Sequence, residues 1–122
     1  MDHVLILTRD EAYGRYLLNL SEQLDSDVKF FVKDPDTFNP KKFYNSMIIL
    51  DQDEIFDNVL HKFRGKSEEA FIVLTDKKET NFGMQNCKVL QKPLDAKYFV
   101  QAVSERLDTK RLVNDEAKNK GK

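Results

Sequence analysis

Five short, mostly apolar runs constrain the fold of this chain more than any other feature of its sequence. The runs are HVLILT (3–8), VKFFVK (28–33), SMIIL (46–50), AFIVLT (70–75) and CKVLQ (87–91). Short apolar runs of this kind are typical of strands that are buried on both faces of a sheet. Segments with helical spacing or turn residues separate the runs, and this alternation predicts a doubly wound α/β domain with a parallel sheet.

Three of the remaining segments show the apolar spacing of a helix. Their apolar stripes are Tyr13, Tyr16, Leu17, Leu20 and Leu24 in the first, Val59, Leu60 and Phe63 in the second, and Phe99, Val100, Val103 and Leu107 in the third. Asp10 and Glu11 precede the first stripe and suit a helix N-terminus. We expect the second helix within 57–66 and the third over 96–107.

Two connections are too irregular or too short for a full helix. The segment 34–45 contains two prolines and has room for only a turn or two of helix. The segment 76–86 is short and polar, and sixteen residues separate Thr75 from Lys92. We therefore expect a shortened helix between the last two strands.

Composition and charge exclude several classes of function. Twenty basic and 21 acidic residues give a net charge of −1, which provides no broad field for nucleic acid or an anionic membrane. The first apolar run is too short for a secretory signal or a membrane span. The single cysteine, Cys87, cannot form an internal disulfide and fits a reducing compartment. We expect a cytoplasmic protein with one domain over 1–108 and a polar tail or linker over 109–122.

Reactive side chains stand where several of the predicted strands end. Asp51 follows the third apolar run, Thr75 ends the fourth, and Lys92 follows the fifth. The carboxyl ends of parallel strands meet at one edge of the sheet, where ligands collect. We therefore expect an acid, a hydroxyl and a lysine to converge there. The sequence has no catalytic triad, zinc-ligand spacing or phosphate-cradling glycine loop, and we do not expect an enzyme.

These segments resemble the receiver domain of two-component response regulators, over about residues 3–107. MIILD matches the strand that ends in the phosphoacceptor, here Asp51, and FIVLT matches the strand that ends in Thr or Ser, here Thr75. VLQKPLD matches the last strand and its Lys-Pro pair, here Lys92 and Pro93. The resemblance implies a flavodoxin-like five-stranded sheet in the order 2-1-3-4-5. It also implies a phosphoryl group on Asp51 that Thr75 and Lys92 contact, with Mg²⁺ held by carboxylates.

The acidic pair that the family carries after its first strand is missing. Our alignment places Thr8 and Arg9 on the pair, whereas a shift of one residue would place Arg9 and Asp10 there. The apolar stripe of the first helix favours the first register, because the second would bring Gly14 and Ser21 into the core. In either register Arg9 replaces a carboxylate.

The charge of Asp51 then needs a partner within the chain. Arg9 could pair with Asp51 and occupy the place of the metal, point into solvent, or pair with Asp53 or Asp76. Lys92 could also pair with Asp51. An arginine and a carboxylate about 4 Å apart attract each other by on the order of 4 kcal/mol at an effective dielectric constant near 20.

Asp76 is a second departure, because the family has a small residue after the Thr of the fourth strand. Asp76 would bring bulk and negative charge to the doorway of the site, or it could cap a short helix that follows. The aromatic residue that the family has on the fifth strand is Val89 here.

The sequence favours an atypical receiver, or pseudo-receiver, of bacterial signalling that binds a protein partner without Mg²⁺-dependent phosphorylation. The alternative is a genuine phosphoacceptor, phosphorylated on Asp51 by a histidine kinase, with Mg²⁺ held by Asp10, Asp51 and Asp53. We expect no metal cofactor in the first case, and no nucleic acid or membrane as a partner. The exposed face of the last helix (Lys97, Tyr98 and Gln101) is a candidate contact surface, including for a homodimer.

Overall fold

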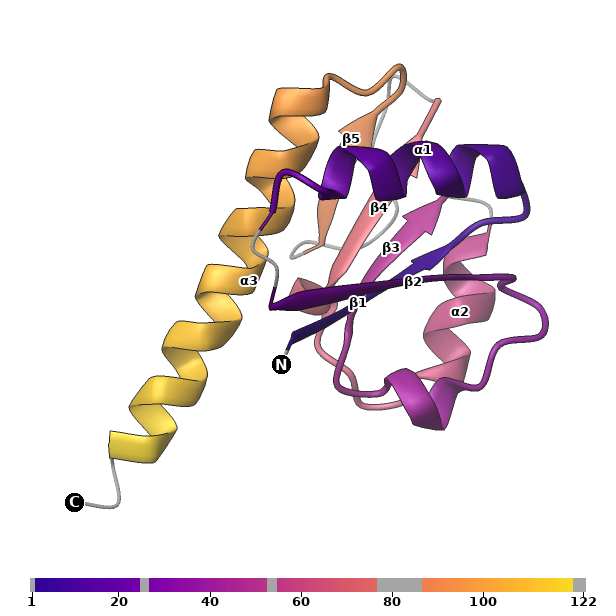
Figure 1. The fold of residues 1–122 in the computed structure, drawn as a ribbon. Coiled ribbons are helices and arrows are strands. Elements are labelled where there is room, and N and C mark those ends of the chain that lie inside the picture. The colour runs from indigo at the N-terminus through magenta and orange to yellow at the C-terminus, as the bar shows by residue number, and fades with distance from the viewer. Residues whose placement is uncertain (1, 25–26, 53–54, 77–86, 120–122) are drawn as a thin grey trace.

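A five-stranded parallel sheet in the order β2-β1-β3-β4-β5 forms the centre of the molecule (Figure 1). The strands are β1 (Asp2–Leu7), β2 (Val28–Lys33), β3 (Met47–Asp51), β4 (Phe71–Thr75) and β5 (Lys88–Gln91). The computed structural model describes residues 2–24, 27–52, 55–76 and 87–119. The predicted fold class and strand order are confirmed, and each strand begins and ends within one residue of its predicted place.

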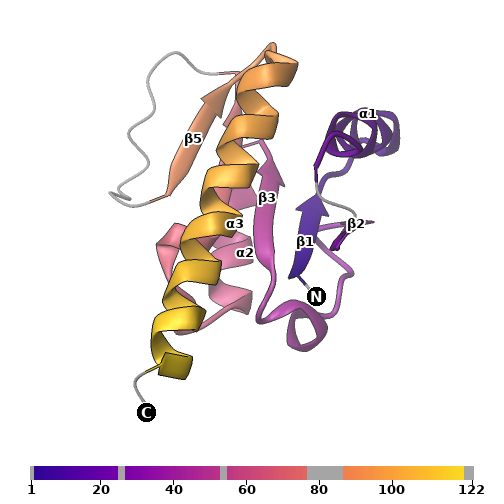
Figure 2. The same cartoon turned by 60° about the vertical axis from the view of Figure 1, so that its left-hand side comes forward.

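Helices α1 (Glu11–Ser21) and α3 (Ala96–Asn119) cover one face of the sheet (Figure 2). Successive residues of a strand point to opposite faces, and Val4 and Ile6 of β1 point to this one. The core on this side contains Val4, Ile6, Leu17, Val28, Met47, Ile49, Ile72, Leu74, Leu90, Phe99, Ala102, Val103 and Leu107.

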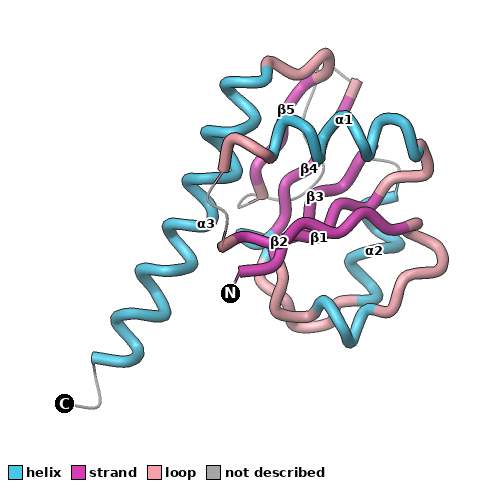
Figure 3. The backbone as a smooth tube through the Cα atoms, in the orientation of Figure 1, coloured by secondary structure: helices cyan, strands magenta, loops and turns pink. Residues whose placement is uncertain are grey.

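The opposite face is covered by α2 (Phe56–Lys62) and by the connection between β2 and β3. This connection contains a single 3₁₀ turn, Pro40–Phe43, which Figure 3 shows within a longer loop. The core on this side is rich in aromatic rings, and the rings of Phe63 and Phe71 lie 6.2 Å apart. The prediction that this connection holds only a turn or two of helix is confirmed.

Two lysines attach the β2–β3 connection to α2 and the residues that follow it. The Lys62 ammonium donates to the Pro35 carbonyl at 2.7 Å and lies 5.1 Å from the centre of the Phe38 ring. The Lys66 ammonium donates to the Tyr44 carbonyl. Carbonyls outside regular structure need such partners, and the two lysines supply them at both ends of the connection.

The buried face of α1 includes most of the predicted stripe, since Leu17 is buried and Tyr13, Leu20 and Leu24 pack against the core. Its buried residues are Gly14, Leu17 and Ser21, whereas Tyr16 is 42% exposed. A β-carbon at Gly14 would lie only 2.6 Å from Cγ1 of Val32, so the helix approaches the sheet where it has no side chain. A count of apolar residues misses this close packing. Gly14 and Ser21 do face the core, so the helix gives no reason to prefer one alignment register over the other.

Helix α3 continues to Asn119, beyond Leu107, where the sequence predicts its end. Figure 2 shows its second half extending past the lower end of the sheet. The shortened helix that we expect between β4 and β5 falls mainly on residues 77–86, which lie outside the described residues. None of the helices in the described part of the chain is long and apolar enough to cross a membrane.

Candidate functional site

Asp51 lies at the carboxyl end of β3, and only 6% of its surface is exposed. Both oxygens of its carboxylate have partners that follow other strands, one after β1 beside β3 and one after β5, two strands away. Oδ2 accepts a hydrogen bond from the Thr8 hydroxyl at 2.5 Å, and Oδ1 forms an ion pair with the Lys92 ammonium. The carboxylate is therefore buried, charged and satisfied within the chain, as a buried charge must be.

Thr8 follows β1 and connects Asp51 to the start of α1. Its hydroxyl oxygen accepts a hydrogen bond from the backbone N–H of Asp10 at 3.0 Å. The single hydroxyl proton can go to Asp51 at 2.5 Å or to the Asp10 carbonyl at 3.3 Å, and the shorter distance favours Asp51. Our alignment places Thr8 where the family has one residue of its acidic pair. At this position the Thr8 side chain contacts the Asp51 carboxylate.

Lys92 is held by its backbone as well as by its side chain. Its N–H donates to the Thr75 carbonyl at 2.8 Å, which continues the ladder between β4 and β5 beyond the last paired residues. Its side chain is only 13% exposed. Removing one partner from a buried ion pair leaves an uncompensated charge, so Asp51 and Lys92 depend on each other. Thr75 itself is fully buried at the end of β4.

Arg9 pairs with Asp36 and not with Asp51. Its Nε and Nη2 donate to the two carboxylate oxygens of Asp36 at 3.1 and 3.0 Å, and both side chains are about half exposed. This hydrogen bond is the main reason why the pKa of Asp36 lies below its usual value. The hypothesis that Arg9 occupies the place of the metal beside Asp51 is wrong in this structure. Arg9 reaches a partner in the β2–β3 connection without burying its guanidinium, which would be costly.

Tyr13 is a member of the site that sequence reasoning missed. The Lys92 ammonium lies 4.2 Å from the centre of the Tyr13 ring, within the range of a cation–π contact. Burial, followed by the nearby Asp51 charge, raises the pKa of Tyr13 to about 12. Tyr13 lies in the first turn of α1, directly after a strand end that faces the site, and this position was the signal that could have identified it.

Asp76 lies beside the site but on its exposed side. Its Oδ2 accepts a hydrogen bond from the side-chain amide of Gln52 at 3.1 Å, which connects the residues that follow β3 and β4. Gln52 adopts a positive φ of 86°, a backbone conformation that is strained for a residue with a side chain. Helix capping by Asp76 would involve residues outside the described part of the chain.

The described residues are a poor set of ligands for Mg²⁺, which prefers six oxygens including one or two carboxylates. Asp51 already carries an ammonium and a hydroxyl, and Arg9 brings no oxygen. The Asp10 carboxylate caps α1 by accepting from the Tyr13 N–H at 3.1 Å, and Asp53 lies outside the described residues. Within the described ranges no group of three or more His, Cys, Asp or Glu side chains is placed to hold a metal.

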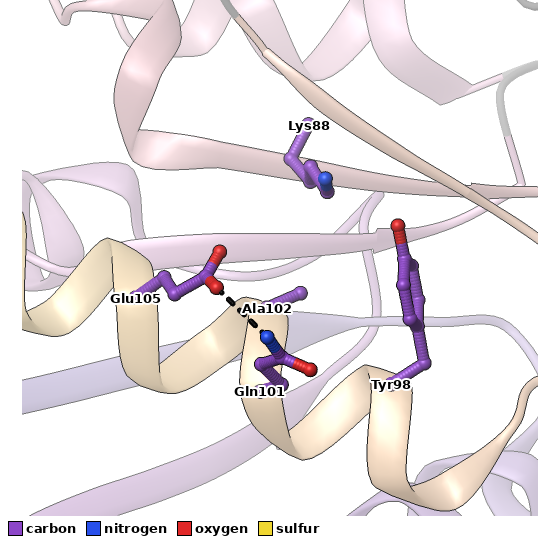
Figure 4. A pocket seen from close by; sticks show the side chains of 5 residues that line it. All are labelled: Lys88, Tyr98, Gln101, Ala102 and Glu105. Carbon is purple, nitrogen blue, oxygen red and sulfur yellow. Dashed lines mark hydrogen bonds between the residues drawn. The ribbon is translucent and has the colours of Figure 1, made fainter.

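The predicted contact surface on α3 is exposed. Lys97, Tyr98 and Gln101 all face solvent, and Tyr98 and Gln101 help to line a small cavity of about 150 Å³ against β5 (Figure 4). The Lys88 ammonium lies 5.6 Å from the centre of the Tyr98 ring, and Gln101 donates to Glu105 at 3.1 Å. This face of α3 is therefore accessible to solvent.

Three solved structures share this architecture. A CheY-like response regulator from Mesorhizobium loti is 17% identical, with a TM-score of 0.59 over 86% of this chain and 98% of the other. A two-component transcriptional regulator AraC from Clostridium phytofermentans is 13% identical, with a TM-score of 0.60 over 97% and 99%. A putative pilus assembly-related protein from Burkholderia pseudomallei is 12% identical, with a TM-score of 0.62 over 87% and 89%.

This chain has the receiver fold. No protein-family model matches the sequence, and no curated protein matches it. At identities of 12 to 17% the likeness establishes the fold alone, because one fold serves many functions.

Proposed function

We propose that this chain is an atypical receiver that works as a signalling module through contacts with a protein partner. In this proposal Asp51 is not phosphorylated with the help of Mg²⁺, and the domain is not an enzyme. The observation that carries the proposal is that both oxygens of Asp51 are engaged by side chains of the same chain, Thr8 and Lys92.

Phosphorylation of an aspartate requires a free carboxylate oxygen that attacks phosphorus while the bond to the donor's leaving group breaks. The incoming phosphoryl oxygens also need cationic groups that neutralise their charge. Here the Lys92 ammonium is already neutralised by Asp51, and Arg9 pairs with Asp36. Lys92 would have to leave Asp51 before the reaction, and a buried charge that is separated from its partner is costly, which weighs against the reaction.

A second candidate is a genuine phosphoacceptor, phosphorylated on Asp51 by a histidine kinase. It is supported by the convergence of Asp51, Thr75 and Lys92 at one edge of the sheet, where the family's chemistry needs them. In this case Lys92 would leave Asp51 and contact the phosphoryl group instead.

A mass measurement separates the two candidates. The protein is incubated with Mg²⁺ and acetyl phosphate, and its intact mass is recorded beside a phosphorylatable receiver as a positive control. We expect no phosphoryl adduct on this chain. An adduct that disappears in Asp51→Asn would overturn the proposal and establish the phosphoacceptor.

The absence of a metal requirement is tested separately by a Mg²⁺ titration with amide NMR spectra. We expect the signals of Asp51 and its neighbours to stay in place at sub-millimolar Mg²⁺. Saturable shifts at Asp51 that vanish in Asp51→Asn would show that a metal binds there, whether or not phosphorylation follows.

The partner in this proposal is a protein, and neither nucleic acid nor a membrane is involved. In this proposal the protein partner can be a second copy of the chain, bound through the exposed face of α3. Sedimentation equilibrium of the protein and of Tyr98→Ala tests it, because a dimer that depends on this face should weaken in the variant. A protein that stays monomeric at all concentrations would exclude the homodimer, and the partner would then be a different protein. A cytoplasmic location also remains part of the proposal.

A further inference from the structure

We propose that Tyr13 is a positioning residue that keeps the Lys92 ammonium on Asp51 and covers this ion pair. The inference rests on the proposed function and deepens it, because it names the side chain that closes the site. The observation behind it is the 4.2 Å distance between the Lys92 ammonium and the centre of the Tyr13 ring.

The ammonium of Lys92 is held between two unlike groups. The Asp51 carboxylate accepts one of its hydrogen bonds, and the Tyr13 ring presents its electron-rich face to the cation. A lysine that moves away from Asp51 therefore also leaves the ring. Desolvation strengthens cation–π attraction, and the side chain of Lys92 is mostly buried.

The backbone fixes the place of the Tyr13 ring. The Asp10 side chain accepts from the Tyr13 N–H and so anchors the first turn of α1. Gly14 lets this turn approach the sheet, since a β-carbon there would lie 3.1 Å from Cγ2 of Thr8 and closer still to Val32. The close approach of the helix brings Tyr13 over the strand ends that carry Asp51 and Lys92.

The phenol acts here through its neutral ring. Burial and the Asp51 charge both disfavour a tyrosinate, and the pKa of Tyr13 is raised to about 12. Its hydroxyl therefore stays protonated at neutral pH. Tyr13→Phe keeps the aromatic ring and should therefore still hold the Lys92 ammonium. Tyr13→Leu removes the ring and should release it.

Reductive methylation with formaldehyde and a borane reductant measures how often Lys92 leaves its partners. The reaction adds methyl groups to unprotonated, accessible amines, and peptide mass mapping gives a rate for each lysine. Lys62 is a matched internal reference, because its ammonium also donates a hydrogen bond and lies over a ring, that of Phe38. Lys88, beside the exposed ring of Tyr98, is a reference for an open contact.

We expect Lys92 to react at least about tenfold more slowly than Lys88 in the unmodified sequence, in keeping with a desolvated cation–π contact on an ion pair. Tyr13→Leu should raise the Lys92 rate several-fold and leave Lys62 unchanged. Tyr13→Phe should change it by less than about twofold. Tyr98→Leu should leave Lys92 unaffected.

Three results would overturn the inference. One is a Lys92 rate that Tyr13→Leu does not change. Another is an equal acceleration of the Lys62 and Lys92 rates in Tyr13→Leu, because the substitution would then only have lowered the stability of the whole domain. The third is a Lys92 that is methylated as fast as Lys88 in the unmodified sequence. A phosphoryl adduct on a chain whose Lys92 is still protected by Tyr13 would instead refute the proposed function and leave this inference standing.

Discussion

Replacing Lys92 by Met tests the interaction on which the whole site depends. Methionine keeps much of the length and apolar character of lysine but removes the ammonium. Asp51, which is 6% exposed, would keep the hydrogen bond from Thr8 and lose its counter-ion. We expect the fold to survive, because the core on both faces of the sheet is untouched, and the free energy of unfolding to fall.

The size of the loss follows from the burial of the two groups. Opposite charges about 4 Å apart attract by about 4 kcal/mol at an effective dielectric constant of 20. Part of this is offset because the variant no longer buries the ammonium, whose side chain is 13% exposed. We therefore expect Lys92→Met to lower the free energy of unfolding at pH 7 by about 3 kcal/mol.

The assay is urea unfolding followed by far-ultraviolet circular dichroism, with the slope against urea compared between variants to check two-state behaviour. A double-mutant cycle with Asp51→Asn isolates the pair, and we expect a coupling energy of about 2 kcal/mol or more. Arg9→Ala is the matched control, and its exposed ion pair with Asp36 should contribute less than about 1 kcal/mol. A loss below 1 kcal/mol for Lys92→Met, or an equal loss for Arg9→Ala, would refute the reasoning.

Three further predictions concern the surroundings of the pair. Thr8→Val should lower the free energy of unfolding by about 1–3 kcal/mol because Asp51 loses a buried donor, whereas Thr8→Ser should restore most of it; urea unfolding measures both. Gly14→Ala should destabilise by about 1–3 kcal/mol because the new methyl group meets Val32, and Val32→Ala in the same chain should recover part of the loss; a lack of recovery would contradict the close approach. In an absorbance titration at alkaline pH, one of the four tyrosines should ionise near pH 12 and be missing in Tyr13→Phe. The pKa of Tyr13 is higher in the folded protein than the unfolded value of about 10, so its contribution to stability is complete below pH 10 and is lost as pH rises toward 12. Because Tyr13 is partly exposed, we expect this contribution to be about 1 kcal/mol.

The sheet and the central pair of the site could be predicted from sequence for the same reason. Each strand is a short apolar run, and parallel strands bring their carboxyl ends to one edge of the sheet. The long side chain of Lys92, which follows β5, reaches Asp51 there across the end of β4. Arg9 was harder, because its partner Asp36 lies in an irregular connection whose path no periodic pattern records.

The place of Gly14 and Ser21 on the buried face of α1 was missed because hydrophobicity is a poor guide where a helix packs very close to a sheet. Gly14 and Ser21 are small enough for that contact, and the Ser21 hydroxyl is satisfied by donating to the Leu17 carbonyl at 2.7 Å. Tyr13 was counted as one more apolar residue of the stripe. Its role at the site depends on the position of the ring over Lys92, which composition does not reveal.

The two ion pairs of this edge of the sheet should respond differently to ionic strength. Arg9 and Asp36 are about half exposed, and mobile ions screen charges over a Debye length of about 8 Å at physiological salt. Asp51 and Lys92 are largely buried, so ions cannot readily come between them. Added salt should therefore weaken the Arg9–Asp36 pair, which attaches the β2–β3 connection, and leave the Asp51–Lys92 pair intact. The surroundings of the site can then loosen while Asp51 and Lys92 stay together.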